Sequence, residues 1–293
     1  MKPPFGYYGA KLRIASQIIN SLPPHNAWVE AFCGSAAITI AKKPAPIEII
    51  NDLDNQIVNL FEQLRNNSEK LIRAICLTPY ARQEYFSSKQ KDDIAEPLEK
   101  ARRFLVSTMM TVNGAVGATG AGFSFCQSYA RDGREARVNR WYNLPERLKL
   151  VVERLKSIRV ENRDARELLN MFLNKPATLF YMDPPYLMDR SHKYNHDIDE
   201  DFHIELLKIS NKAKCMILIS SYDNDLYNEY LSSKNGWTKT IIETNTADTS
   251  GKKYKREEVL WKNDHYENAL RNNKVPIRLN EKEKKNNKVN PTR

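Results

Sequence analysis

Short apolar runs that end in polar or acidic residues recur along this chain and predict β-strands. Between several of these runs apolar residues recur at helical spacing, as they do from Leu53 to Leu64. Alternating strands and helices are typical of an α/β fold with a mostly parallel, doubly wound sheet. The expected strands lie near residues 27–31, 47–51, 157–161, 177–182, 214–220 and 238–243.

The stretch from residue 66 to residue 150 has helical spacing without strands in between. We expect helices over Ser68–Leu77, Tyr80–Phe86 and Glu96–Met110, followed by a glycine-rich loop from Asn113 to Phe123. The pattern therefore predicts a discontinuous α/β domain, a mostly helical insertion and a tail. Their expected bounds are 1–65 with 151–270, then 66–150, then 271–293.

The net charge of +10 is concentrated in the insertion and the tail. The insertion has 14 basic and 9 acidic residues, a net charge of +5, and the tail has 8 and 2, a net charge of +6. A basic insertion between two ligand-binding segments is typical of a module that grips phosphates, although a solvated helical surface has a similar composition. The tail has few apolar residues, so we expect it to be disordered and to add non-specific affinity or solubility.

The most specific stretch is Tyr181–Tyr186, where a buried strand ends in an acid, two prolines and a tyrosine. The carboxylate of Asp183 can accept a hydrogen bond from an exocyclic amine, and this bond strengthens as positive charge develops on nitrogen. The carbonyl of Pro184 can accept the second N–H, and Pro185 helps to fix its direction. The ring of Tyr186 can stack on a planar base. The stretch favours an enzyme that modifies an amino group of a nucleobase over a mere strand-ending turn.

A turn of small residues follows the first strand and predicts a ligand close to the backbone. Phe32, Gly34 and Ser35 lie between that strand and a helical pattern, where small residues let a ligand approach. The second strand ends at Asp52, 20 residues beyond Phe32, the spacing at which doubly wound domains place a carboxylate on ribose hydroxyls. Asp52 is also a possible helix cap. Asp164, near the end of the third strand, has the same two interpretations.

Four segments occur in the order found in Dam-type (D12 class) adenine-N6 DNA methyltransferases, which the chain resembles. They are Gly6-Tyr7-Tyr8-Gly9-Ala10-Lys11, Glu30-Ala31-Phe32-Cys33-Gly34-Ser35, Asn51-Asp52 and Asp183-Pro184-Pro185-Tyr186. The segment from Lys255 to Asn263 is similar to the chain end of phage and prophage members. The resemblance covers roughly residues 3 to 263. The chain departs from the usual family pattern at Ala10, Ala31 and Ala36.

The resemblance implies a Rossmann-like methyltransferase sheet, S-adenosyl-L-methionine as cofactor and an adenine flipped out of double-stranded DNA. It implies that Tyr7, Lys11, Asp52 and Asp183 line the cofactor site and that Asp183 to Tyr186 hold the adenine. The insertion then becomes a target-recognition region. There we expect DNA contacts, mostly to phosphate, from Asn113, Arg131, Arg134, Arg137 and Arg140. These arginines follow one another at intervals of three, so a helix would place them near one face.

The rest of the sequence excludes some classes of protein. No apolar run approaches the length of a membrane span, and the start lacks the apolar stretch of a signal peptide, so we expect a cytoplasmic enzyme of a bacterial cell or phage-infected host. The four cysteines have no metal-ligand spacing, and reduced thiols and no metal are expected. We expect an active monomer. Whether a restriction endonuclease is its partner stays open.

Two other functions are compatible with the same motifs. Cytosine-N4 methylation uses a chemically similar amine, although an aspartate rather than a serine at residue 183 favours adenine. A DNA-binding module that has lost catalysis is the second alternative, and the intact Asp183–Tyr186 stretch argues against it.

Overall fold

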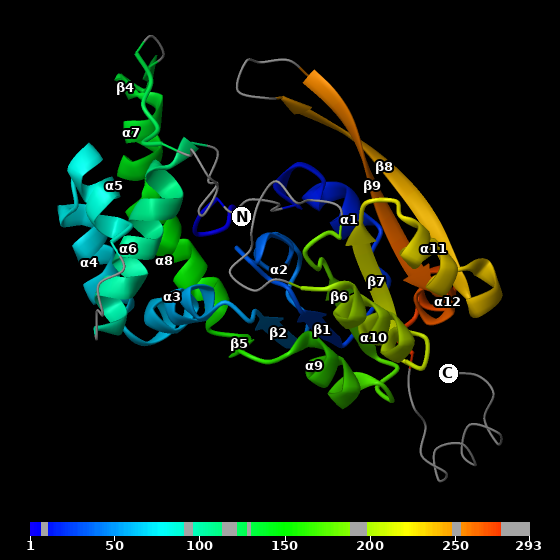
Figure 1. Ribbon diagram of the computed structural model, residues 1–293. Helices are drawn as coiled ribbons and strands as arrows, with labels where there is room; N and C mark the ends of the chain where they lie inside the picture. The colour runs from blue at the N-terminus through cyan, green and yellow to red at the C-terminus, as the bar shows by residue number, and fades with distance from the viewer. Residues whose placement is uncertain are drawn as a thin grey trace.

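A seven-stranded sheet forms the centre of the protein (Figure 1). The computed structural model describes residues 1–6, 11–90, 96–112, 122–127, 130–187, 198–247 and 253–276. The strand order is β5-β2-β1-β6-β7-β9-β8, in which β9 runs antiparallel to β7 and β8 and the other neighbours are parallel. The mixed α/β class with a mostly parallel sheet is therefore confirmed. The strands are β1 (Ala27–Glu30), β2 (Ile47–Asn51), β5 (Ile158–Glu161), β6 (Thr178–Met182), β7 (Met216–Ser221), β8 (Trp237–Ala247) and β9 (Lys253–Asn263).

Helices cover both faces of this sheet, because alternate side chains of the central strands point to opposite sides. Phe180 and Ile217 belong to a core with α9 (Ala165–Phe172), α10 (Glu200–Ser210) and α11 (Asp225–Tyr230). Leu179 and Leu218 belong to a core on the other face, beside α1 (Ala15–Asn20), α2 (Ala37–Ala41) and α12 (Asp264–Asn272). The described residues of this part also form the short 3₁₀ helices η1 (Lys11–Arg13) and η3 (Ser233–Asn235). The sheet is doubly wound, as the alternating sequence pattern predicts.

The strand order changes direction between β1 and β6. From β1 the chain moves outward through β2 to β5, and it then returns to β6 on the other side of β1 before continuing to β7. Connections that leave in opposite directions open a crevice at the carboxyl ends of the two central strands. The topology therefore places a ligand site after Glu30 and Met182.

A helical body lies between β2 and β5 in the sequence and beside the sheet in space (Figure 1). Its core joins apolar side chains such as Leu60, Phe104 and Leu148, and Phe5 packs into it from the amino-terminal segment. The predicted helices exist with small shifts of their ends. The body contains α3 (Asn55–Asn66), α4 (Ser68–Leu77), α5 (Arg82–Ser88), α6 (Pro97–Met110), α7 (Ala136–Tyr142) and α8 (Leu144–Leu155).

The four arginines after the glycine-rich loop do not share one helix. Arg131 lies in β3 (Ala130–Arg131) and Arg134 in β4 (Arg134–Glu135), which pair as an antiparallel hairpin, and only Arg137 and Arg140 lie in α7. The two hairpin strands are joined by Asp132 and Gly133, with φ values of 50° and 72°. Asp-Gly is a strong signal for a two-residue hairpin, and this local turn overrides the helical spacing.

The carboxyl-terminal part contains a strand that the apolar pattern does not predict. β9 pairs with β8 over eleven residues and reaches into the sheet beside β7. Its first half is highly charged, so only Val259–Trp261 forms an apolar run. α12 continues to Asn272, within the predicted tail, and residues 277–293 lie outside the described part of the chain.

Candidate active site

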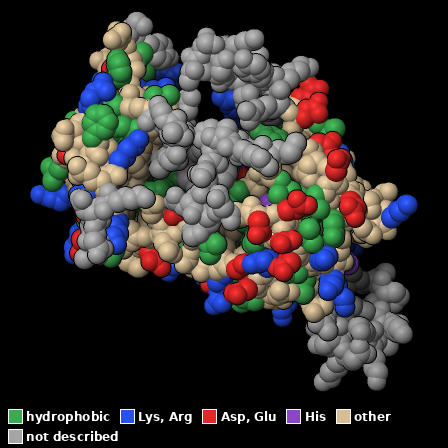
Figure 2. Space-filling view, in the orientation of Figure 1, with side chains coloured by type: hydrophobic (Ala, Val, Ile, Leu, Met, Phe, Trp, Pro, Cys, Tyr) green, Lys and Arg blue, Asp and Glu red, His purple; other side chains and the backbone are tan. Residues whose placement is uncertain are grey.

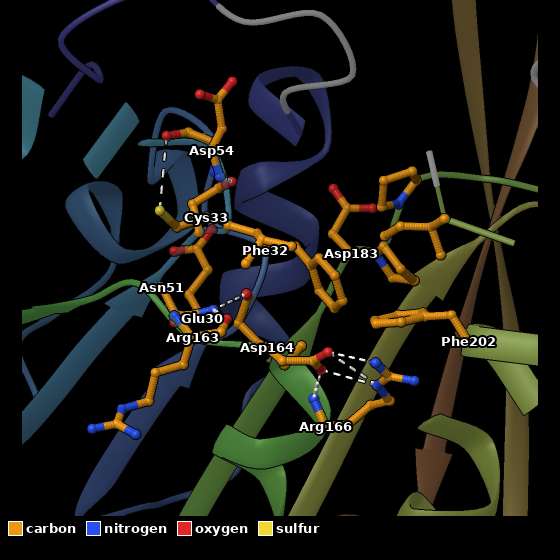
Figure 3. A pocket seen from close by; sticks show the side chains of 18 of the residues that line it. Glu30, Phe32, Cys33, Asn51, Asp54, Arg163, Asp164, Arg166, Asp183 and Phe202 are labelled. Atoms are coloured by element: carbon orange, nitrogen blue, oxygen red, sulfur yellow. Dashed lines mark hydrogen bonds and ion pairs between the residues drawn. The ribbon is translucent and has the colours of Figure 1, made fainter. Parts of the chain in front are cut away.

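A cavity of about 650 Å³ lies at the carboxyl ends of β1, β2, β5 and β6 (Figure 3). The segments that line it follow these four strands and come together although they are far apart in the sequence. Tyr7 lies outside the described residues. The other expected cofactor and catalytic residues all line the cavity: Lys11, Phe32, Gly34, Ser35, Asp52, Asp164, Asp183, Pro184, Pro185 and Tyr186.

The turn after β1 is held by the acid at the end of β2. Asp52 accepts hydrogen bonds from the backbone N–H of Gly34 at 2.8 Å and of Asp54 at 3.0 Å. Asp54, rather than Asp52, caps α3. Burial raises the pKa of Asp52 to about 6, although the backbone N–H donors oppose this shift. Gly34 and Ala36 have φ values of 47° and 52°, in the left-handed region that an alanine adopts only with strain.

Ser35 supplies a buried polar atom that lacks a partner. Its Oγ is buried in the turn and makes no hydrogen bond within the described part of the chain. Leaving a buried hydroxyl unpaired costs free energy. Because Ser35 also lines the cavity, a ligand there could satisfy this hydroxyl.

Two aromatic rings and an ion pair form another part of the cavity wall. Phe32 and Phe202 meet edge to face with their ring centres 6.3 Å apart. The guanidinium of Arg166 lies 4.4 Å from the centre of the Phe202 ring and pairs with Asp164 at 2.6 Å. Asp164 also caps α9, and its pKa is lowered by the hydrogen bonds from Arg166. Asp164 is therefore both a helix cap and a cavity residue.

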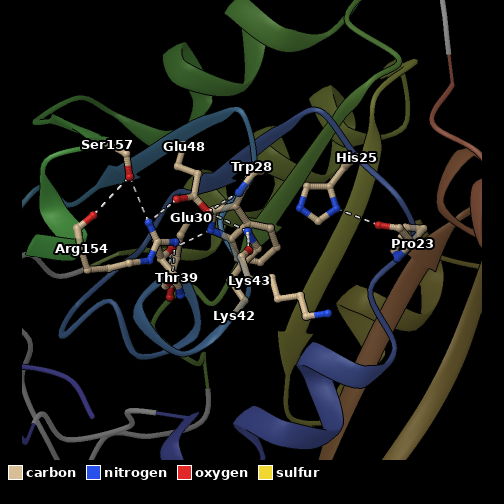
Figure 4. Close-up of polar contacts among 11 residues, drawn as sticks. Pro23, His25, Trp28, Glu30, Thr39, Lys42, Lys43, Glu48, Arg154 and Ser157 are labelled. Atoms are coloured by element: carbon tan, nitrogen blue, oxygen red, sulfur yellow. Dashed lines mark hydrogen bonds and ion pairs between the residues drawn. The ribbon is translucent and has the colours of Figure 1, made fainter. Parts of the chain in front are cut away.

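Glu30 is a buried carboxyl group in the cavity wall (Figure 3), and Figure 4 shows it beside Thr39. It accepts hydrogen bonds from the backbone N–H of Thr39 at 3.0 Å and from the Thr39 hydroxyl. Burial raises its pKa to about 7, more than the Thr39 hydrogen bonds lower it. Glu48, also buried, differs because Lys42 and Arg154 pair with it and hold its pKa low against the effect of burial.

Asp183 is fixed by side chains from η1, from β7 and from its own turn. Its Oδ1 accepts from the ammonium of Lys11 at 2.8 Å and from the hydroxyl of Ser220 at 3.0 Å, while the Tyr186 hydroxyl lies 3.2 Å away. Among the described residues, none is bonded to the other oxygen, Oδ2. The carboxylate is thus anchored through one oxygen and has the second available to a ligand.

The Tyr186 hydroxyl belongs to the same network. It donates to Glu258 at 2.5 Å and accepts from the ammonium of Lys11. Its ring lies against Tyr222, with centres 4.3 Å apart and planes at 58°. The hydroxyl of Tyr186 therefore links Lys11 and Glu258, in addition to the stacking surface that its ring is expected to offer.

Several residues of the site were not singled out by sequence reasoning. Glu30 and Asn51 are the last residues of β1 and β2, and a polar residue at the carboxyl end of a parallel strand indicates a site residue. Asn51 donates to the carbonyls of Ala31 and Arg163 and so ties two cavity turns together. Ser220 follows the same rule at the end of β7, whereas Phe202 and Glu258 carry no local signal.

The arginines of the expected DNA contact lie away from this cavity, and Asn113 is outside the described residues. Arg131 and Arg134 are exposed, and the guanidinium of Arg134 lies 3.9 Å from the centre of the Tyr142 ring. Arg140 packs beside Gly6, and burial lowers its pKa. In Figure 2 acidic side chains gather over the surface where α9 and α10 lie. The exposed acidic residues of these two helices include Glu167, Glu200, Asp201 and Glu205.

Other features of the described residues bear on the expected class. No helix among them is long and apolar enough to cross a membrane. They contain no cluster of three or more His, Cys, Asp or Glu side chains with metal-site geometry. The four cysteines are free thiols.

Comparison with known proteins decides the family. The family model for D12 class N6 adenine-specific DNA methyltransferases matches residues 7–249. The chain belongs to this family. Membership in this D12 class makes the protein a methyltransferase with DNA as substrate, and it implies S-adenosylmethionine as methyl donor.

Other comparisons with known proteins add little to the D12 assignment. No curated protein sequence matches the chain. A precorrin 8W decarboxylase of Methanobacterium thermoautotrophicum is 10% identical, with 90% of this chain and 95% of that chain covered and a TM-score of 0.35. A precorrin-6y C5,15-methyltransferase from Geobacter metallireducens GS-15 is 11% identical, with coverage of 89% and 97% and a TM-score of 0.38. TM-scores this low support no argument about this protein.

Proposed function

We propose that this enzyme methylates N6 of an adenine that is flipped out of double-stranded DNA toward Asp183–Tyr186. The observation that carries the proposal is the state of Asp183, which is anchored through Oδ1 and has Oδ2 available at the cavity. A fixed acceptor that waits for an amine costs no reorganisation when positive charge develops on nitrogen. In our proposal Oδ2 accepts one N–H of the amine and the carbonyl of Pro184 accepts the other.

The cavity residues fit S-adenosyl-L-methionine. A volume of about 650 Å³ is in the range of cofactor sites, and the wall combines aromatic rings with a few polar groups. Asp52 would accept from ribose hydroxyls, the orphaned Ser35 hydroxyl would find a partner, and Phe32 would pack on an apolar part of the cofactor. When bound, the cofactor supplies a methyl group on a positively charged sulfur.

The flipped base would be held by the turn after β6. The ring of Tyr186 offers a stacking surface, and its anchored hydroxyl limits the positions that the ring can take. Prolines 184 and 185 restrict the backbone of the turn, so the Pro184 carbonyl loses little entropy when it accepts a hydrogen bond. Flipping requires such a preformed pocket because the base gives up its stacking in the duplex.

In our proposal DNA contacts the surface that carries the arginine hairpin, and the opposite, acidic surface stays in solvent. Arg131 and Arg134 are exposed at the hairpin, where they would contact phosphates, together with Arg137 and Asn113. Arg140 is packed beside Gly6, so in our proposal it contributes less to binding. The acidic surface over α9 and α10 disfavours phosphate, which is consistent with DNA approaching from the side of the helical body.

Sequencing of DNA from cells that express the protein, with a read-out of modified bases, tests the proposal. We expect N6-methyladenine within a defined short sequence and no such mark in cells that express Asp183→Ala. N4-methylcytosine instead of N6-methyladenine would assign the neighbouring reaction, and no modified base would contradict the proposed function.

A further inference from the structure

Glu258 is a buried carboxylate beside the site, and the proposed function gives it no role. Its side chain is 9% exposed, and it lies in β9, the strand that runs antiparallel to the rest of the central sheet. The register pairs Val259 with Ser221 at the carboxyl end of β7, so Glu258 enters the site from the edge at which the parallel strands end. The neighbouring Glu257 is exposed.

Glu258 is linked to Asp183 through two side chains, Tyr186 and Lys11. It accepts a hydrogen bond from the Tyr186 hydroxyl at 2.5 Å and lies 3.3 Å from the ammonium of Lys11. The same ammonium lies 2.8 Å from Asp183. Lys11 therefore has two carboxylate partners, and both also contact the Tyr186 hydroxyl.

The charges of Lys11, Asp183 and Glu258 together determine how strongly Asp183 stabilises positive charge on an amine. Lys11 and Asp183 alone would form a neutral pair, and a neutral pair stabilises developing positive charge weakly. Burial raises the pKa of Glu258, and the charge of Lys11 opposes this shift. With Glu258 ionised, the three side chains have a net charge of −1. Lys11 and Glu258 are buried and the Asp183 side chain is only 17% exposed, so water screens this difference in charge weakly. Burial lowers the pKa of Lys11, but the two acids outweigh it and raise that pKa, so the lysine stays charged.

Resting on the proposed function, we infer that Glu258 is a positioning residue that acts through Lys11 and Tyr186. It offsets the charge of Lys11, so that Asp183 keeps a negative field at the amine, and it fixes the hydroxyl of Tyr186. A purely structural role, in which Glu258 only neutralises a buried lysine, predicts lower stability without a slower reaction in the folded enzyme.

A double-mutant cycle separates these roles. Glu258→Gln removes the charge and keeps an oxygen that accepts from Tyr186, and Glu257→Gln on the same strand is the matched control. Single-turnover methyl transfer is measured with saturating DNA and cofactor, so that the rate reports on the step after binding. We expect Glu258→Gln to slow transfer on the order of tenfold, with Glu257→Gln at the wild-type rate.

The second half of the cycle is measured in a Lys11→Gln background. There the lysine charge that Glu258 offsets is absent, so Glu258→Gln should cost much less or speed the reaction. If the single Glu258→Gln variant fails to fold, the two variants with Lys11→Gln are still compared, and a cost of Glu258→Gln on the order of tenfold there would overturn the inference. An equal cost in both backgrounds, or a wild-type rate for Glu258→Gln, would overturn the inference. Absence of N6-methyladenine with the wild-type enzyme would instead refute the proposed function.

Discussion

The two sides of the cavity hold their carboxylates by different means. On the side of β1 and β2, Asp52 is held by backbone N–H groups and Glu30 by both donors of Thr39, and neither acid forms an ion pair with a described residue. On the side of β6, Asp183 is held by side chains from η1 and β7, and Glu258 shares its lysine. Burial raises the pKa values of the first pair, to about 6 and about 7.

This difference indicates a division of labour. Backbone donors fix the position of an acid without cancelling its charge, which suits the binding of a cationic cofactor. A network of side chains can tune the field that an acid presents to a reacting group, because each partner brings its own charge. The predictions below test whether the β1–β2 side governs binding and the β6 side governs reaction rate.

The largest effect should come from the β6 side. Asp183→Ala should lower the rate of methyl transfer by roughly a hundredfold to a thousandfold, because the amine loses its charged acceptor. Asp225→Ala, at an exposed position in the first turn of α11, is the control. Single-turnover kinetics with DNA and cofactor in excess give the rate, and transfer by Asp183→Ala at the wild-type rate would show that the β6 side does not govern the reaction.

The pH dependence of the unfolding free energy should reveal the raised pKa of Glu30, on the β1–β2 side of the cavity. A carboxyl group whose folded pKa is about 7 contributes full stability below about 4.5, and the contribution is lost as the pH rises toward 7. For Glu30 this amounts to roughly 3 kcal/mol. Glu30→Gln cannot ionise, so its unfolding free energy should change less between pH 4.5 and 7, with a smaller slope remaining from Asp52. Denaturant unfolding at several pH values tests this, and identical slopes for both proteins would disprove the raised pKa.

Cofactor affinity should depend on Asp52. Asp52→Asn keeps the size of the side chain but removes its charge, and we expect binding to weaken by about 1.5–3 kcal/mol, roughly tenfold to a hundredfold. Titration calorimetry with S-adenosyl-L-methionine measures it, with Asp225→Asn as the exposed control. Unchanged affinity would reduce Asp52 to a residue that only shapes the Gly34 turn.

The two functions of Tyr186 should separate in a short series. Tyr186→Ala loses both ring and hydroxyl, and stacking alone is worth about 1–3 kcal/mol per base. Tyr186→Phe retains the ring and loses only the hydroxyl with its contacts to Asp183, Glu258 and Lys11, so its loss in catalytic efficiency should be smaller. The values of kcat/KM are compared for Tyr186→Ala, Tyr186→Phe and Tyr186→Trp. Equal values for Ala and Phe would exclude stacking, and a wild-type value for Phe would exclude a role for the hydroxyl.

The sequence predicts the β1–β2 side of the site better than the β6 side for a physical reason. Asp52 accepts a hydrogen bond from Gly34, only 18 residues away. Both residues follow strands that the apolar pattern of the sequence predicts. The contacts of Lys11 and Glu258 to Tyr186 span 175 and 72 residues, and no local pattern encodes them. β9 escaped prediction because its charged first half lacks apolar alternation. The arginine hairpin had a local signal in Asp132-Gly133, but the spacing of the arginines obscured it.

The central claim is that the exocyclic amine of the target adenine, which we propose to lie at Asp183, is the group that receives the methyl. The most direct test uses two duplexes with the same methylated sequence, in one of which the target adenine is replaced by purine, the base without the amine. The purified enzyme and S-adenosyl-L-methionine are added, and digested nucleosides are identified by mass spectrometry. We predict N6-methyladenine from the first duplex and no methylated base from the second. A methylated base in the purine duplex, or methylation of cytosine in the first, would contradict the claim.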